Sequence, residues 1–143
     1  MIDTNVALST FKRGHPNRPI FDAWAAGRLR WATSTEILLE YEETAGRLTH
    51  PAYIALVFQT MEAVEAVRQN VHRVSPSFRF HVITGDADGN RFANCANCAN
   101  CAIAAGADFI ITEDHHFDVM RGSGYKPQPV TPEEFIRLHV GGG

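Results

Sequence analysis

The chain has 143 residues, a formal net charge of −3, 45% hydrophobic residues and 20% charged residues. A chain of this length folds around one hydrophobic core, so we expect a single domain over residues 1–140 and a flexible glycine tail at 141–143. No apolar run approaches the roughly 18 residues that a membrane span needs, which argues against a membrane protein. The acidic balance argues against a protein that binds nucleic acid through bulk positive charge. It does not exclude a nuclease, because a site that holds divalent cations must itself be acidic.

The cellular compartment is predicted from the first residues and from the cysteines. The N-terminal segment has no apolar block behind a basic start, which a signal peptide would show. All three cysteines lie between Cys95 and Cys101, and thiols so close together make a poor disulfide framework. We therefore expect a cytoplasmic protein in a reducing environment.

Short apolar runs alternate with segments of helical period in the first half of the chain. In chain order we expect a very short strand at 1–2, a helix at 19–26, a strand at 29–33, a helix capped by Ser34 that ends at Gly46, and an amphipathic helix from 51 to about 71. This alternation predicts an α/β fold with a mostly parallel sheet.

The second half repeats the alternation. We expect a strand at 78–82 that leads into the polar segment 85–90, a helix from Asn90 that closes at Gly106, an apolar strand at 109–112, and a short helix capped by Thr131. Four aromatic side chains at strand or helix spacing are expected in the core: Trp24, Trp31, Phe78 and Phe80.

Acidic residues follow three of the expected strands. Asp3 follows the first, Asp86 and Asp88 follow the strand at 78–82, and Asp114 follows the strand at 109–112. The carboxyl ends of strands in an open α/β sheet form one crevice, so we expect these carboxylates to converge. Their mutual repulsion would destabilise the fold unless a cation holds them, and oxygen ligands suit Mg²⁺ or Mn²⁺.

A fourth acid is expected from the helix that follows Ser34. Glu36 and Glu40 lie one turn apart on the same face, so either could point into the crevice. Glu40 is the choice, because it sits deeper in the helix and directly precedes the partly apolar Tyr41. Glu42 and Glu43 are expected in solvent.

Four short motifs carry a resemblance to a known family. "IDTNV" (2–6), "SxEILxEY" (34–41), "DxDxNxF" (86–92) and "IITED" (110–114) resemble the acidic motifs of PIN-domain ribonucleases. Together with "VTPEEF" (130–135), they are most similar to VapC-like toxins of toxin–antitoxin systems. Gly89 stands where relatives have a second aspartate after Asp88.

The resemblance implies a PIN-like, Rossmann-like three-layer α/β/α sandwich and a metal-dependent endoribonuclease that cleaves single-stranded RNA. It implies the catalytic acids Asp3, Glu40, Asp88 and Asp114. It implies Mg²⁺ or Mn²⁺ ligands at Asp3, Asp86, Asp88 and Asp114. It implies supporting roles for Thr4, Asn5, Asn90 and Thr112. It further implies an antitoxin protein as partner and a homodimer.

Two other functions remain open from the sequence. Gly89 and the repeat described below are compatible with a catalytically impaired PIN domain that acts as an RNA- or protein-binding module. A phosphatase-like α/β enzyme with an aspartate nucleophile would need a second aspartate in "DTN" (3–5), which the chain lacks. In a metal-dependent nuclease, the substrate phosphates would meet the metal ions and a few basic residues such as Lys12, Arg13, Arg91 and Lys126.

The sequence Ala-Asn-Cys occurs three times in succession over 93–101. The family pattern fits this segment with one copy, so we interpret it as ordinary helix with six extra residues. Six residues turn a helix by about 600°, equivalent to about 240°, and lengthen it by about 9 Å. We therefore expect either a bulged or looped-out insert, or a helix that extends past its usual N-terminus.

The cysteine spacing also resembles iron–sulfur ligation, but the chain has no fourth cysteine, and the alanine that follows each cysteine favours helix. Buried, structural thiols are the favoured interpretation. His115 and His116 follow Asp114 and could approach a metal or substrate, although a surface or helix-start role is favoured for them.

Overall fold

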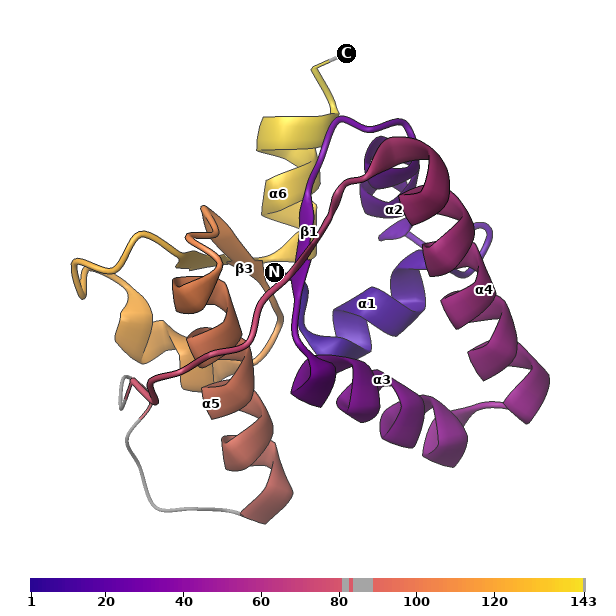
Figure 1. Cartoon of the computed structure of the whole chain (residues 1–143). Helices are drawn as coiled ribbons and strands as arrows, with labels where there is room; N and C mark the ends of the chain where they lie inside the picture. The colour runs from indigo at the N-terminus through magenta and orange to yellow at the C-terminus, as the bar shows by residue number, and fades with distance from the viewer. Residues whose placement is uncertain (81–82, 84–88, 143) are drawn as a thin grey trace.

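The computed structural model describes residues 1–80, 83 and 89–142, with the backbone alone for 89–92. Its α-helices are α1 (Thr4–Thr10), α2 (Arg18–Ala25), α3 (Thr35–Leu48), α4 (Pro51–Arg68), α5 (Gly89–Ala104) and α6 (Pro132–Phe135). Its strands are β1 (Trp31–Thr33), β2 (Val71–Arg73), β3 (Phe109–Ile111) and β4 (Gln128–Val130). The segment η1 (His115–Met120) is a 3₁₀-helix, and η2 (Ile136–Val140) is a π-helix. In Figure 1, helices α1–α4 lie to the right of β1 and α5 lies to its left.

The described strands pair in parallel, as the alternation predicts. β1 pairs with β2, with Trp31 opposite Val71, and β3 pairs with β4, with Phe109 opposite Gln128. The expected strand at 1–2 is reduced to one parallel bridge between Ile2 and Ile111. Within the described residues these strands form two two-stranded sheets, so the α/β class is confirmed and the three-layer sandwich stays a prediction.

Helices α3 and α4 end at different residues from those expected. Ser34 caps α3 as predicted, by accepting a hydrogen bond from Ile37 N, but the helix continues through Gly46 to Leu48. A Cβ at Gly46 would lie 3.8 Å from the Ile54 side chain, so the glycine lies at the contact with α4 rather than at a helix end. α4 stops at Arg68 because Gln69 is left-handed (φ 51°), and Val71 belongs to β2.

The expected strand at 78–82 is wrong over its described part. Residues 78–80 form no strand, and Phe78 is 76% exposed rather than buried. Phe80 is half-buried and packs edge-on against Tyr125, with 6.1 Å between ring centroids. Period-2 hydrophobicity alone was therefore an insufficient signal for a strand over these residues.

Helix α5 runs without interruption from Gly89 to Ala104, so the looped-out alternative for the repeat is wrong. The extra residues are accommodated as additional helix. The three cysteines are buried along it, as expected for small apolar side chains. None of the described helices is both long and apolar enough to span a membrane.

The core holds the N-terminal segment in place. Phe11, Phe21, Trp24 and Trp31 form an aromatic cluster with ring centroids 5.0–6.5 Å apart. Nearby, the buried Tyr41 hydroxyl donates a 2.7 Å hydrogen bond to Ile2 O. This bond ties α3 to the backbone immediately before Asp3.

Candidate metal site at the strand ends

Asp3 lies at the junction between the Ile2 bridge and α1. Its backbone N–H donates to Ile111 O at 3.0 Å, which fixes the residue beside the end of β3. Its carboxylate caps α1 by accepting from Thr4 N at 2.8 Å, and it also accepts from Thr112 Oγ1 at 2.9 Å. The direction of this carboxylate is therefore set by two elements that are distant in the sequence.

Asp114 is joined to Asp3 through one hydroxyl group. The backbone N–H of Asp114 donates to Thr112 Oγ1 at 2.9 Å, and the same hydroxyl donates to Asp3. The Asp114 carboxylate caps η1 by accepting from His116 N at 2.9 Å. The structure thus brings together two of the predicted acids, with the predicted supporting residue Thr112 between them.

Glu40 joins the same network from α3. Its carboxylate accepts from Thr4 Oγ1 at 3.2 Å and from Asn97 Nδ2 at 3.3 Å, and the residue is 8% exposed. Glu36, the alternative one turn earlier, is exposed. The position of Glu40 therefore matches the choice made from the sequence, and Glu42 and Glu43 lie in solvent as expected.

The three carboxylates titrate differently because their surroundings differ. Burial raises the pKa of Asp3, and the negative charge of Asp114 adds to this effect although hydrogen bonds from Thr112 and Thr4 oppose it. Burial likewise raises the pKa of Glu40 to about 7. For Asp114, burial acts in the same direction, but hydrogen bonds from the His116 backbone and ring outweigh it and hold the pKa below its usual value.

The Ala-Asn-Cys repeat lines this site, which the sequence interpretation missed. Cys95 Sγ donates to Asp114 Oδ2 at 3.4 Å, and Cys98 Sγ donates to Asp3 Oδ1 at 3.9 Å. Burial and the neighbouring carboxylates raise the pKa of both thiols. Burial also raises the pKa of Cys101, to about 11. The signal available in the sequence was the three-residue spacing, which keeps successive side chains within about 60° on a helix.

His116 also belongs to this site. Its ring Nδ1 lies 2.6 Å from Asp114 Oδ1, whereas His115 is turned outward and lies 3.4 Å from Asp118. The ligand atoms of Cys95, Asp114 and His116 all lie within 4.8 Å of one another. The surface or helix-start role favoured from the sequence is correct for the position of His116 in η1 but omits its contact with the acid.

Several predicted site residues are not brought into this network. Asn5 is exposed on the first turn of α1. Asp86 and Asp88 lie outside the described residues, as does the side chain of Asn90. The contribution of the third acidic motif therefore stays a prediction.

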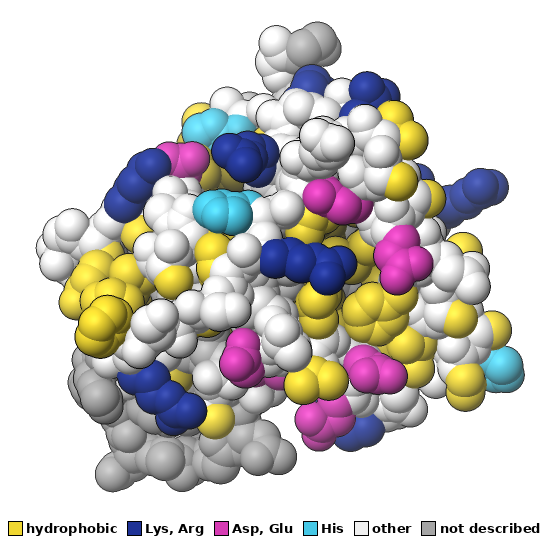
Figure 2. All heavy atoms as spheres, in the orientation of Figure 1, with side chains coloured by type: hydrophobic (Ala, Val, Ile, Leu, Met, Phe, Trp, Pro, Cys, Tyr) yellow, Lys and Arg dark blue, Asp and Glu magenta, His cyan; other side chains and the backbone are white. Residues whose placement is uncertain are grey.

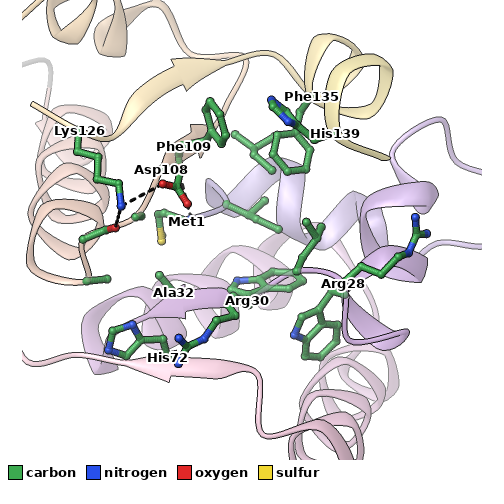
Figure 3. Close-up of a pocket in the computed structure, with 18 residues that line it drawn as sticks. Met1, Arg28, Arg30, Ala32, His72, Asp108, Phe109, Lys126, Phe135 and His139 are labelled. Carbon is green, nitrogen blue, oxygen red and sulfur yellow. Dashed lines mark hydrogen bonds and ion pairs between the residues drawn. The ribbon is translucent and has the colours of Figure 1, made fainter. Parts of the chain in front are cut away.

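A cavity of about 490 Å³ lies elsewhere, between the two small sheets. Its lining includes Arg30, His72 and Asp108, and also Phe135 and His139 from the C-terminal helical segments (Figure 3). Asp3, Glu40 and Asp114 are not among the lining residues. Lys126 lines this cavity and pairs with Asp108 at 3.0 Å, so it is not placed at the acidic network as its predicted role with substrate would require.

Basic side chains do not form a single nucleic-acid-binding surface on the face shown in Figure 2. The dark blue Lys and Arg side chains are scattered among magenta acidic ones and white polar ones. Lys12 and Arg13 are exposed beyond the end of α1, and the side chain of Arg91 lies outside the described residues. This face therefore offers no continuous basic surface to a phosphate chain.

Comparison with known proteins gives one match. A family model described as PIN domain matches residues 1–116, a segment that contains Asp3, Glu40 and Asp114. No curated protein and no solved structure is significantly similar to the chain.

Proposed function

The chain belongs to the PIN-domain family, a family of nucleases that generally depend on divalent metal ions, and on this premise we propose that it is an endoribonuclease that cleaves single-stranded RNA with Mg²⁺ or Mn²⁺. The observation that carries the proposal is the convergence of three predicted acids. Asp3 precedes α1, Glu40 lies in α3 and Asp114 follows β3. Thr4 connects Asp3 and Glu40 through its backbone N–H and its hydroxyl, and the Thr112 hydroxyl connects Asp3 to the backbone of Asp114.

The donor chemistry of these residues fits a hard divalent cation. The raised pKa values of Asp3 and Glu40 indicate that buried carboxylates are held together without full compensation of their charge. A divalent ion would supply that compensation, with Asp3 and Asp114, which Thr112 joins, as oxygen ligands and with Glu40 and the aspartates at 86 and 88 as further candidates. When bound, it would lower the pKa of a water molecule and neutralise charge on the scissile phosphate.

The protein's own side chains orient this site. Thr112 fixes Asp3 and Asp114 relative to each other, and Thr4 and Asn97 hold the two oxygens of Glu40. Such outer hydrogen bonds set the direction in which a carboxylate offers its lone pairs. These hydrogen bonds support the orienting roles that the resemblance implies for Thr4 and Thr112.

The proposal is tested with single-stranded RNA, Mn²⁺ and two variants, Asp3→Asn and Asp114→Asn. Each should abolish Mn²⁺-dependent cleavage and retain the wild-type circular dichroism spectrum. Asp118→Asn is the matched control, because Asp118 is an exposed acid of the same η1 segment and pairs with Arg121. Unchanged cleavage by both site variants would refute the assignment.

The second candidate function is a catalytically impaired PIN domain that binds RNA or protein. It is motivated by Gly89 in place of an acid and by thiols directed at Asp3 and Asp114. Thermal unfolding at increasing Mn²⁺ separates the two, because an ion that binds the folded state must raise its stability. A melting temperature that stays constant up to millimolar Mn²⁺ would favour the binding module.

We further propose that this nuclease is the toxin of a cytoplasmic toxin–antitoxin pair and forms a homodimer. Exposed apolar side chains on α3 and α4 support a protein partner, since Leu39, Leu48, Leu56 and Val67 are each more than half exposed. Yellow hydrophobic side chains are also visible over this side of the molecule in Figure 2. Sedimentation of the purified chain would report the dimer, and a monomer at micromolar concentration would contradict it.

A further inference from the structure

We propose that Cys95, Asp114 and His116 form a second, thiophilic metal site, which binds Zn²⁺ and thereby withdraws Asp114 from the acidic network. The site combines Cys95 of α5 with Asp114, which caps η1, and His116, which lies in the first turn of η1. Its ligand atoms are one sulfur, one carboxylate oxygen and one imidazole nitrogen, all within 4.8 Å of one another.

The distances are close to those of a tetrahedral zinc centre. Zn–S bonds of about 2.3 Å and Zn–N or Zn–O bonds of about 2.0–2.1 Å place neighbouring ligand atoms about 3.3–3.6 Å apart. Cys95 Sγ and Asp114 Oδ2 are already separated by 3.4 Å. His116 Nδ1 lies 2.6 Å from the other carboxylate oxygen, Asp114 Oδ1, which is shorter than tetrahedral spacing, so the ring must move away from the carboxylate to admit an ion.

The His116 ring has room to move, whereas Asp114 and Cys95 are more deeply buried. The side chain of His116 is 41% exposed, whereas that of Asp114 is 16% exposed and Cys95 is buried. The imidazole can therefore rotate to admit an ion, while α5 and Thr112 hold the other two ligands. Three protein ligands leave a fourth position for water, an arrangement common among zinc sites that are not purely structural.

The ligand types distinguish this site from the acidic one. Thiolate and imidazole select zinc-like ions, whereas Mg²⁺ and Mn²⁺ prefer oxygen ligands. Asp114 belongs to both sets, because Thr112 also ties it to Asp3. An ion held by Cys95 and His116 would thus compete for a carboxylate of the nuclease site, and this inhibitory consequence rests on the proposed function.

The binding claim is tested with Co²⁺ as a spectroscopic substitute for Zn²⁺, since ligation by a thiolate gives a charge-transfer absorption that oxygen ligands do not. Wild-type protein should bind Co²⁺ with this absorption and lose it when Zn²⁺ is added. Cys95→Ala should lack the absorption, and His116→Ala should bind at least about tenfold more weakly, since even an outer partner of a metal ligand contributes that much.

Cys101→Ala is the matched control. It removes the same atoms from the last copy of the same repeat, about 9 Å further along α5. This control should retain the absorption at wild-type affinity. Persistence of the absorption in Cys95→Ala, its loss in Cys101→Ala, or its absence from the wild type would each overturn the proposed site.

The inhibitory claim is tested separately by adding Zn²⁺ to Mn²⁺-dependent RNA cleavage. Each protein is compared with its own rate before Zn²⁺ is added. Zn²⁺ should inhibit the wild type and Cys101→Ala at least about tenfold more strongly than Cys95→Ala. Equal inhibition of all three would overturn the competition. If no protein cleaves RNA, the nuclease proposal fails while the Co²⁺ spectra still decide the metal site.

Discussion

Replacement of Glu40 by glutamine should stabilise the metal-free protein at alkaline pH. Glutamine has the same shape, and its amide can satisfy both neighbours, since the oxygen can accept from Asn97 and the nitrogen can donate to the Thr4 hydroxyl. The change therefore removes the ionisable group and can keep the hydrogen bonds with Thr4 and Asn97. The two proteins then differ mainly in the buried negative charge of Glu40, and the comparison measures its effect on the free energy of unfolding.

The size and sign of that effect follow from the pKa of Glu40, which burial raises from 4.5 to about 7. The folded protein binds this proton more tightly than the unfolded chain does, so the associated stability is fully present below pH 4.5 and is lost as pH rises through 7. A difference of about 2.5 pH units corresponds to at most about 3 kcal/mol. Glu40→Gln keeps this stability at every pH.

Urea unfolding in EDTA, followed by the fluorescence of the buried Trp24 and Trp31, measures the difference. At pH 8, Glu40→Gln should be up to about 3 kcal/mol more stable than wild type, or up to about 9 °C in melting temperature. At pH 4 the two should agree. Glu36→Gln, an exposed position on the same helix, should behave as wild type. A constant difference between pH 4 and pH 8 would refute the reasoning.

Two further changes test the connections within the site. Thr112→Val removes the hydroxyl between Asp3 and Asp114 and should lower Mn²⁺ affinity by about 10–100-fold, whereas Thr112→Ser should retain it; titration calorimetry measures both, and equal affinities would contradict the orienting role. Tyr41→Phe leaves Ile2 O and Trp31 Nε1 without their buried partner and should cost about 1–3 kcal/mol in urea unfolding. Wild-type stability of this variant would show that the hydroxyl does not hold the segment before Asp3.

The strand-end acids could be placed from the sequence because local rules determine them. Apolar residues before Asp3 and Asp114 predict parallel strand ends. Glu40 is favoured over Glu36 because it sits deeper in the helix after Ser34 and directly precedes Tyr41. These predictions depend on hydrophobic periodicity and helix capping, and both can be recognised within a short segment of sequence. The convergence of carboxylates then follows from parallel topology.

The partners of those acids could not be predicted in the same way. Whether a thiol faces Asp114 depends on the rotation of α5 against β3 and η1, which is set by packing over the whole helix. His116 presents the same difficulty, because its ring direction depends on the 3₁₀ geometry of η1 rather than on its place after Asp114. The short strand β4 was missed because Pro129 within it weakens the β signal.

The repeated tripeptide makes α5 nearly periodic along its own axis. One copy advances a helix by about 4.5 Å and rotates it about 60° short of a full turn. Gain or loss of a copy by an in-frame change in the gene would therefore bring another thiol close to the place of the previous one. The helix could thus become longer or shorter by one copy and still present thiols to Asp3 and Asp114.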